Sequence, residues 1–146
     1  MKIRDALKRD GGAAVTVSPD ESVAEAARRI DEAGKGLAVV LDKEGVLLGI
    51  LSVIDINRGI ARHGARLPEL PVREVMNPKF CACASDDAVE AALERMTEAG
   101  IRHLPVVEAG RLRGLVTLHD LLRLRFDEAQ VEGEELRRYF FGAGYH

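Results

Sequence analysis

The fold of this chain is decided by a phrase that occurs twice, GILSVID at residues 49–55 and GLVTLHD at residues 114–120. In each copy a glycine is followed three positions later by Ser or Thr and six positions later by Asp. An apolar run leads into each phrase, and a helical pattern follows it. A repeat of this kind predicts two copies of one structural unit.

A helix is expected before the phrase in each copy. Its apolar residues have the i, i+3, i+4, i+7 spacing of an amphipathic helix. They recur after 66 residues: Val23, Ala26, Ala27 and Ile30, then Val89, Ala92, Leu93 and Met96. A glycine, Gly34 or Gly100, follows each helix and suits a left-handed C-terminal cap. Ser22 and, one residue out of register, Asp87 each precede a glutamate by three positions, the spacing of a capping box.

Two apolar runs joined by turn residues lie between this helix and the phrase, so each copy is expected to contain a hairpin. The runs cover residues 37–41 and 46–51, then 104–107 and 112–116, and a further strand is expected before each helix, at 14–17 and 80–84. Neither unit has enough apolar surface to bury its sheet alone. We therefore predict an α+β fold of two βαββα units that pack as a pseudo-twofold pair.

Three prolines, Pro68, Pro71 and Pro78, mark the connection between the units. The chain is accordingly divided into a first unit with its lead-in (1–60), a linker with the lead-in to the second unit (61–78), the second unit (79–125) and a C-terminal helical tail (126–146).

The tail continues a heptad-like stripe formed by Leu122, Phe126, Ala129, Gly133, Leu136 and Phe140. This spacing predicts a helix that packs on a partner surface and bends or breaks at Gly133. An apolar stripe at a chain end more often docks on its own subunit or a sister subunit than on a foreign protein.

The composition is that of a small soluble protein. Of 146 residues, 47% are apolar and 31% are charged, which is typical of one globular domain. No apolar run approaches the roughly 18 residues needed to span a bilayer, and Asp5 lies where a signal peptide would be apolar. We therefore expect a cytoplasmic protein that does not enter a membrane. A net charge of −3 with dispersed basic residues argues against nucleic-acid binding.

The sequence offers little for catalysis or for metal binding. It contains no GxxxxGK phosphate loop, no HExxH motif and no GxSxG elbow. Cys81 and Cys83 are too close for an unstrained disulfide, and no Cys or His nearby completes a zinc site. We expect a non-enzymatic protein without a metal, in which both cysteines lie in a strand and nothing nearby supports a redox role.

The two copies of Gly-x-x-(Ser/Thr)-x-x-Asp resemble the signature that closes a CBS repeat. Residues 100–107, GIRHLPVV, resemble the segment that precedes this signature, and residues 72–76, VREVM, resemble the lead-in to a second repeat. Residues 3–7, IRDAL, are a weaker version of that lead-in. The chain thus resembles a stand-alone tandem CBS pair, or Bateman module, over roughly residues 1–125. The first repeat departs from the pattern at residues 35–38, KGLA, where the basic pair and the proline are missing.

The closing phrases carry candidate ligand-binding residues. Asp55 and Asp120 can accept hydrogen bonds from the vicinal hydroxyls of a ribose, and Ser52 and Thr117 can bond a hydroxyl or a phosphate oxygen. The helix that starts there adds free N–H groups and a positive dipole end. The glycine of each phrase lets a ligand ring or another backbone come close. Helix N-capping alone explains the same spacing, so this alternative stays open.

The second repeat adds basic residues. Arg102 can bind a phosphate in a fork and His103 can donate as well, but strand alternation points them to opposite faces, so one of them is expected to meet a given ligand. In CBS modules the corresponding pair commonly faces the cleft where phosphates lie. The resemblance also places Val17 and Cys83 in the walls of an adenine slot, and His119 is a weaker candidate.

The resemblance implies a regulatory module that catalyses no reaction and requires no cofactor. It would bind an adenosine-type ligand (AMP, ADP, ATP, NAD or S-adenosylmethionine) between the repeats, form a homodimer and act on an unknown protein in trans. Unequal sites are expected, because the Arg-His segment is present in the second repeat alone. The alternative is a homodimeric interaction scaffold with vestigial pockets, and an enzyme acting on the nucleotide ranks last.

Overall fold

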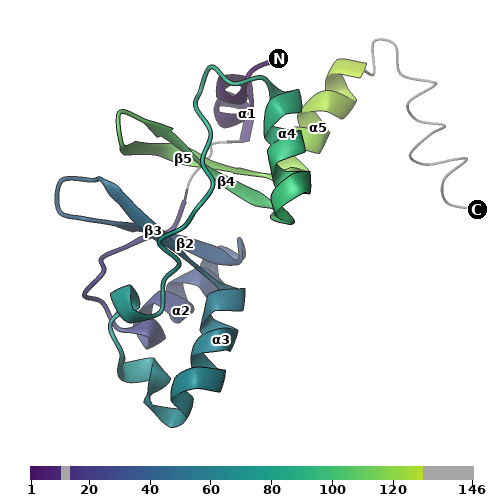
Figure 1. Cartoon of the computed structure of the whole chain (residues 1–146). Helices are drawn as coiled ribbons and strands as arrows, with labels where there is room; N and C mark the ends of the chain where they lie inside the picture. Colours follow the sequence, from purple (N-terminus) through teal and green to yellow (C-terminus); the bar gives the residue numbers. More distant parts are fainter. Residues whose placement is uncertain (11–13, 130–146) are drawn as a thin grey trace, which may run out of the picture.

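The computed structural model describes residues 1–10 and 14–129, which form two lobes (Figure 1). The first lobe contains β1 (Thr16–Val17), α2 (Val23–Ala33), β2 (Leu37–Leu41), β3 (Leu47–Ser52) and α3 (Val53–His63), followed by the 3₁₀ helices η1 (Gly64–Glu69) and η2 (Val72–Glu74). The second lobe contains α4 (Val89–Ala99), β4 (His103–Glu108), β5 (Arg111–Thr117) and α5 (Leu118–Ala129), with α1 (Ile3–Asp10) beside them. The predicted α+β fold of two repeated units is confirmed.

The first lobe is built on a three-stranded sheet of order β1–β2–β3. β1 runs parallel to β2, and β2 pairs antiparallel with β3. α2 begins as predicted at Ser22, whose Oγ accepts a hydrogen bond from the Glu25 N–H at 3.2 Å. The apolar stripe of α2 and the inner faces of the strands form one core of Val17, Ala26, Ile30, Ala38, Val40, Leu51 and Val72.

The second lobe has a two-stranded sheet, because the strand predicted at residues 80–84 is reduced to a bridge at Cys83. In the first lobe, the Val39 N–H donates to the Val15 carbonyl at 2.8 Å. The matching residue of β4 is Pro105, which has no N–H to donate. Without that bond the pairing stays short, and the prediction of a full strand was wrong.

The C-terminal end of α4 agrees with the prediction, and its N-terminal end does not. Gly34 and Gly100 cap α2 and α4 in the left-handed region, with φ of 70° and 66°, as predicted. The N-cap of α4 is Ala88, which makes no side-chain cap bond. Asp87 instead accepts a hydrogen bond from the Ala84 N–H at 2.9 Å and closes the preceding turn. The capping box predicted at Asp87 is therefore wrong, because this residue lies one position before the cap.

The lead-in before the first repeat packs on the second repeat. The N–H groups of Ile3 and Arg4 donate to the carbonyls of Asp87 and Ser85, both at 3.0 Å. Ile3 is fully buried and belongs to the core of the second lobe. Figure 1 accordingly places α1 beside α4 and α5, away from the repeat that it precedes.

The lead-in before the second repeat packs on the first repeat in the same way. The N–H groups of Val72 and Arg73 donate to the carbonyls of Glu21 and Pro19, at 2.8 and 3.0 Å. Val72 is fully buried in the core of the first lobe. The two repeats thus exchange their lead-ins reciprocally, as a twofold relation between them requires, and neither lobe is complete without residues from the other half of the chain.

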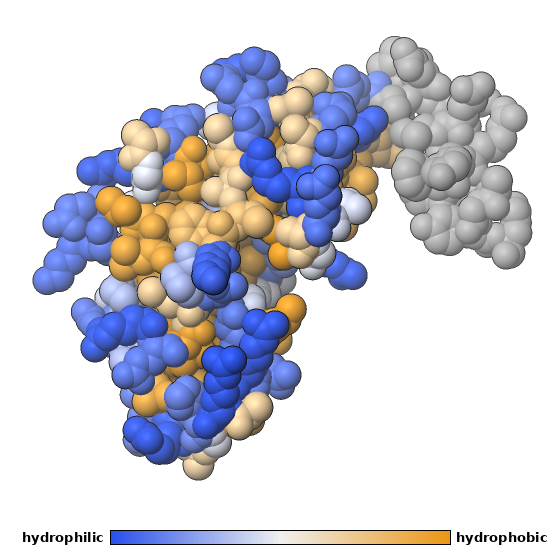
Figure 2. Space-filling model, viewed as in Figure 1, coloured by the Kyte–Doolittle hydropathy of each residue, from blue (hydrophilic) through white to orange (hydrophobic). Residues whose placement is uncertain are grey.

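The two sheets also meet directly, through an apolar cluster of Leu37, Val39, Leu47 and Leu115. At the hairpin tips Val46 forms a bridge with Arg111, whose guanidinium donates to the Glu44 carbonyl at 2.6 Å. Figure 2 shows apolar residues gathered at the middle of the molecule, while polar residues cover much of both lobes on this face.

α5 extends to Ala129 and therefore includes the first residues of the predicted C-terminal helix. Residues 130–146, which carry the rest of the predicted apolar stripe, lie outside the described residues. Within the described ranges, none of the helices has the length and apolar character needed to cross a membrane.

Gly49, the first residue of the repeated phrase, lies against the connection between the lobes. A β-carbon at this position would lie 2.8 Å from the carbonyl oxygen of Asn77 and 3.0 Å from the sulfur of Met76.

Glycine-to-alanine changes in strands normally stabilise the folded protein. We predict the opposite for Gly49→Ala, a loss of about 1–3 kcal/mol in the free energy of unfolding, because the Asn77 backbone cannot give way cheaply. Urea denaturation measures this, and unchanged or increased stability would contradict the close approach.

Candidate functional site

The N-terminus of α3 is closed by Ser52 and Asp55. Ser52 is the N-cap, and its Oγ accepts a hydrogen bond from the Asp55 N–H at 3.2 Å. In return, Asp55 Oδ2 accepts hydrogen bonds from the Ser52 N–H at 2.8 Å and from the Ser52 hydroxyl at 2.9 Å. The capping role that the sequence left open is therefore present, and it fixes the position of both side chains.

Capping occupies one oxygen of the Asp55 carboxylate. The residue is 8% exposed, and its Oδ1 has no hydrogen-bond partner among the residues that the structure describes. A carboxylate oxygen offers two acceptor positions, so Oδ1 can still accept one or both hydroxyls of a ribose. Only half of the carboxylate is thus available for a ligand, instead of the two oxygens considered from the sequence.

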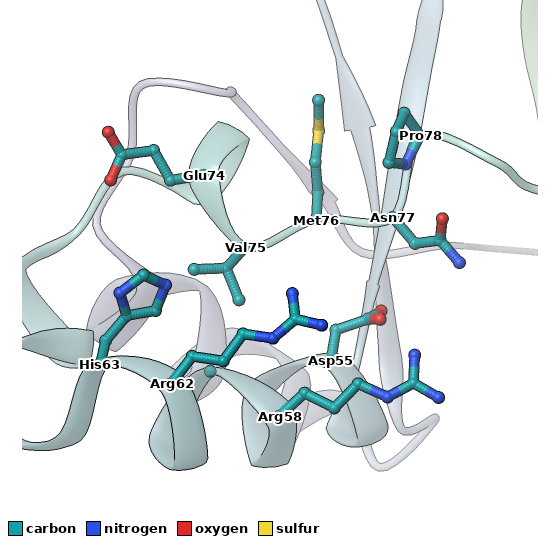
Figure 3. Close-up of a pocket in the computed structure, with 10 residues that line it drawn as sticks. Asp55, Arg58, Arg62, His63, Glu74, Val75, Met76, Asn77 and Pro78 are labelled. Atoms are coloured by element: carbon teal, nitrogen blue, oxygen red, sulfur yellow. The ribbon is translucent and has the colours of Figure 1, made fainter.

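Asp55 lines a cavity of about 230 Å³ between α3 and the chain that follows η2 (Figure 3). We call this cavity the α3 pocket. Its lining residues come from two segments, Asp55, Arg58, Gly59, Arg62 and His63 on α3, and Glu74 with residues 75–78 on the connection to the second repeat. In Figure 3 the α3 side chains rise from the helix toward Val75, Met76 and Asn77 on the opposite wall.

The opposite wall of the α3 pocket is held in place by β3. The Asn77 N–H donates to the Ile50 carbonyl at 2.8 Å, and the Ile50 N–H donates to the Asn77 carbonyl at 3.0 Å. Gly49 permits this approach because it has no side chain. In the first repeat, the glycine of the phrase therefore serves the approach of another backbone, which was one of its two predicted uses.

The second copy of the phrase forms a similar arrangement at the start of α5. Asp120 Oδ2 accepts a hydrogen bond from the Thr117 N–H at 3.0 Å, and Thr117 Oγ1 accepts one from the Asp120 N–H at 3.0 Å. The Ser52 hydroxyl donates to its aspartate, whereas among the described residues the Thr117 hydroxyl has no acceptor. Thr117 is therefore better placed than Ser52 to donate to a ligand oxygen.

Arg102 and His103 lie beside this second copy. His103 is paired with Thr117 across β4 and β5, and the Arg102 carbonyl accepts a hydrogen bond from the Leu118 N–H at 2.8 Å. We call Arg102, His103, Thr117 and Asp120 the α5 cluster. The Arg102 side chain is exposed and that of His103 is half-buried. Neither residue lines the α3 pocket.

His103 also reaches the first repeat. Burial lowers the pKa of its imidazole below the usual value, although a hydrogen bond to the backbone of Lys35 acts in the opposite direction. Near pH 7 the imidazole is therefore neutral, and Arg102 is the cation of the α5 cluster.

The remaining predicted residues lie apart from the α3 pocket. Val17 and Cys83 are 3% and 5% exposed and belong to the cores of the first and second lobes. Burial raises the pKa of the Cys83 thiol to about 12, so it stays protonated at neutral pH. Cys81 and His119 are exposed. The described ranges contain no group of three or more His, Cys, Asp or Glu that could hold a metal ion.

Sequence reasoning missed much of the α3 pocket. Arg58 and Arg62 follow Asp55 by three and seven positions, which places them on the same side of α3. That spacing was the available signal. Residues 75–78 were assigned to a linker, and nothing local in their sequence indicates that they fold back onto β3.

Comparison with known proteins identifies relatives of the chain. The family model of the CBS domain matches residues 12–62 and 72–127. The CBS domain-containing protein YhcV of Bacillus subtilis is 35% identical over 106 residues, which are 73% of this chain and 74% of YhcV.

Two solved structures share the fold. The CBS-domain containing protein ATU1752 from Agrobacterium tumefaciens has a TM-score of 0.78 and 35% identity, over 85% of this chain and 92% of that one. The CBS domain pair of protein MJ0100, solved in complex with 5′-methylthioadenosine and S-adenosyl-L-methionine, has a TM-score of 0.74 and 25% identity, over 86% of this chain and 99% of that one.

The burial of His103 makes the α5 cluster sensitive to pH. We predict that NMR titration of its imidazole gives a pKa below the ordinary value of 6.5. The unfolded chain takes up this proton near pH 6.5 and the folded chain does so at lower pH, so acidification through this range favours unfolding. His103→Gln should therefore lose less stability than the wild type between about pH 7 and pH 5. A pKa at or above 6.5 would contradict the burial of the ring.

Proposed function

Because the chain belongs to the CBS-domain family and carries two repeats, we propose that it is a non-catalytic regulatory module that binds an adenosine-containing ligand between them. The candidate ligands are AMP, ADP, ATP, NAD and S-adenosylmethionine. The observation that carries the proposal is Asp55, a nearly buried carboxylate with one oxygen held by a helix cap and the other left to a cavity. In the proposal the module acts in the cytoplasm on a protein target in trans.

The chemistry of the α3 pocket suits a nucleoside. Asp55 Oδ1 is an acceptor for ribose hydroxyls, and its carboxylate is fixed in place by the Ser52 cap before any ligand arrives. Val75 and Met76 offer apolar surface on the opposite wall. The CBS pair of MJ0100 was solved with two adenosine-containing compounds, which supports the same ligand class here.

The architecture offers a route from binding to regulation. One wall of the α3 pocket is a helix of the first repeat, and the other wall is the connection that enters the second repeat. A ligand that contacts both walls favours the position in which this connection lies against α3, and the connection carries that preference to the second repeat. In this mechanism a protein partner recognises the arrangement of the two lobes, and no bond of the ligand is broken.

Exposed apolar residues on α3 favour a second candidate, a homodimeric interaction scaffold with vestigial pockets. Val53, Ile54 and Ile60 are 57%, 64% and 56% exposed. Apolar residues that gather on one exposed helix often mark an interaction surface. We propose a second copy of the chain as the occupant of this surface, and the homodimer is compatible with either function.

The nucleotide function predicts a stability gain that depends on both aspartates. AMP at about one hundred times its dissociation constant should add about 2.7 kcal/mol to the free energy of unfolding. Asp55→Asn and Asp120→Asn each keep one oxygen for the helix cap but present an N–H₂ group where a ligand hydroxyl would donate. A thermal-shift measurement should therefore show a reduced gain in each single variant and none in the double variant.

Asp31→Asn, on the exposed surface of α2, is the matched control and should keep the full gain. If no adenosine compound raises the unfolding temperature, or if the gain survives in the double variant, the nucleotide function is wrong and the scaffold remains.

The homodimer is tested by the mass of the chain in solution. Light scattering after size-exclusion chromatography should give twice the monomer mass for the wild type. Val53→Lys together with Ile60→Lys, seven positions apart and so on one face of α3, should give the monomer mass, whereas Glu98→Lys on α4 should leave the dimer intact. A monomeric wild type, or a dimer that survives the two α3 substitutions, would exclude this interface.

A further inference from the structure

The α3 pocket carries charges of both signs. Arg58 and Arg62 rise from α3, and the carboxylates of Asp55 and Glu74 belong to the same lining. Asp55 lies in the first turn of α3, whereas Glu74 is the last residue of η2, on the opposite wall. In Figure 3 Asp55 and Asn77 lie at one end of the pocket and Glu74 lies at the other, with the Arg62 guanidinium between the two ends. The formal charges of these side chains cancel, so the lining as a whole does not complement an anion.

The charges beyond Asp55 are not used by the fold. The side chains of Arg58, Arg62 and Glu74 form no hydrogen bond or ion pair with any described residue. Arg73, the neighbour of Glu74, by contrast forms an ion pair with Asp20. The guanidinium groups and the Glu74 carboxylate are therefore too far apart to bind each other directly, which leaves room for a ligand group that meets both.

We propose that these charges select an adenosine ligand that carries an α-amino acid group at its 5′ end, the group found in S-adenosylmethionine. Such a group holds a carboxylate and an ammonium on one carbon. A guanidinium of Arg58 or Arg62 can donate two parallel N–H groups to the carboxylate, and Glu74 can accept from the ammonium. The proposal rests on the proposed function and narrows its ligand class from adenosine compounds in general to this one.

Glu74 is the residue that separates this ligand from a phosphorylated nucleotide. A phosphate monoester carries close to two negative charges at neutral pH and no positive charge. It can bond the arginines, but the Glu74 carboxylate repels it. The α-amino acid group satisfies both signs of charge, and it alone makes use of the whole lining.

The size and polarity of the α3 pocket set the orientation of this ligand. Its volume of about 230 Å³ is below the roughly 300–1,000 Å³ typical of sites for whole drug-sized ligands. The pocket therefore holds part of the ligand, with the ribose at Asp55 and the amino-acid group toward Glu74. Val75 lies between these two ends in Figure 3 and offers apolar surface to the thioether chain that joins them.

The second repeat lacks this arrangement. The residue that matches Glu74 in the other lead-in is Asp5, whose Oδ2 accepts a hydrogen bond from the Lys2 N–H at 2.9 Å. On α5 the residue 65 positions after Arg62 is Asp127, so a carboxylate replaces the cation. Selection for an α-amino acid group is thus a property of the α3 pocket.

The test compares S-adenosylhomocysteine with 5′-methylthioadenosine by isothermal titration calorimetry of the full chain. Both compounds are adenosine thioethers with a neutral sulfur, and only the first carries the amino-acid group. Asp120→Asn serves as the background, so that binding at the α3 pocket is measured alone. At pH 8 imidazoles are neutral, which prevents His63 from adding a third cation to the lining. We expect S-adenosylhomocysteine to bind about tenfold more tightly than 5′-methylthioadenosine.

Glu74→Gln tests the residue on which the selection depends. The amide neither attracts an ammonium nor repels a phosphate, so the affinity ratio of the two thioethers should fall by about threefold or more and AMP should bind more tightly by a similar factor. The affinity for 5′-methylthioadenosine should stay the same, which shows that the pocket is intact. Glu69→Gln, at an exposed glutamate outside the lining, is the matched control and should change none of these affinities.

The other outcomes overturn the proposal in distinguishable ways. If the two thioethers bind equally and still depend on Asp55, the adenosine function stands and the selection for an amino-acid group is wrong. If AMP binds more tightly than S-adenosylhomocysteine before any change at Glu74, the arginines serve a phosphate instead. If no adenosine compound binds, the proposed function fails and this inference fails with it.

Discussion

The exchange of lead-ins is the constraint on which the rest of the structure depends. Ile3 completes the core of the second lobe and Val72 completes the core of the first, so the chain crosses between the repeats on both sides. The second crossing is followed by the backbone pairing of Asn77 with Ile50, which brings the connection over α3. The same crossing therefore joins the lobes and builds a wall of the cavity that Asp55 lines.

Local patterns predicted the parts of the fold that local interactions determine. The helices α2 and α4 and the hairpins follow from apolar periodicity, and Ser22 follows from capping chemistry. The strand expected at residues 80–84 failed because its partner carries Pro105, a consequence visible only once strands are paired. The exchange of lead-ins could not be predicted either, because nothing in the residues around Ile3 distinguishes packing on one repeat from packing on the other.

The candidate site likewise combines residues that the repeated phrase identifies with residues that the fold brings to it. Asp55 and Asp120 were found from the phrase, and their capping geometry is nearly identical. What makes the two places different lies just outside the phrase: Arg58 and Arg62 follow it on α3, and Arg102 precedes its second copy. The expected inequality of the two sites stays a prediction, to which the structure adds that His103 is half-buried and that burial lowers the pKa of its imidazole.

The central claim is that Asp55 binds the ribose of an adenosine ligand in the α3 pocket. A crystal structure of the chain grown with AMP tests it most directly. The account predicts AMP between α3 and residues 75–78, with a ribose hydroxyl within hydrogen-bond distance, about 2.5–3.0 Å, of Asp55 Oδ1. AMP bound elsewhere, with Asp55 engaged by its cap alone and an empty α3 pocket, would contradict it.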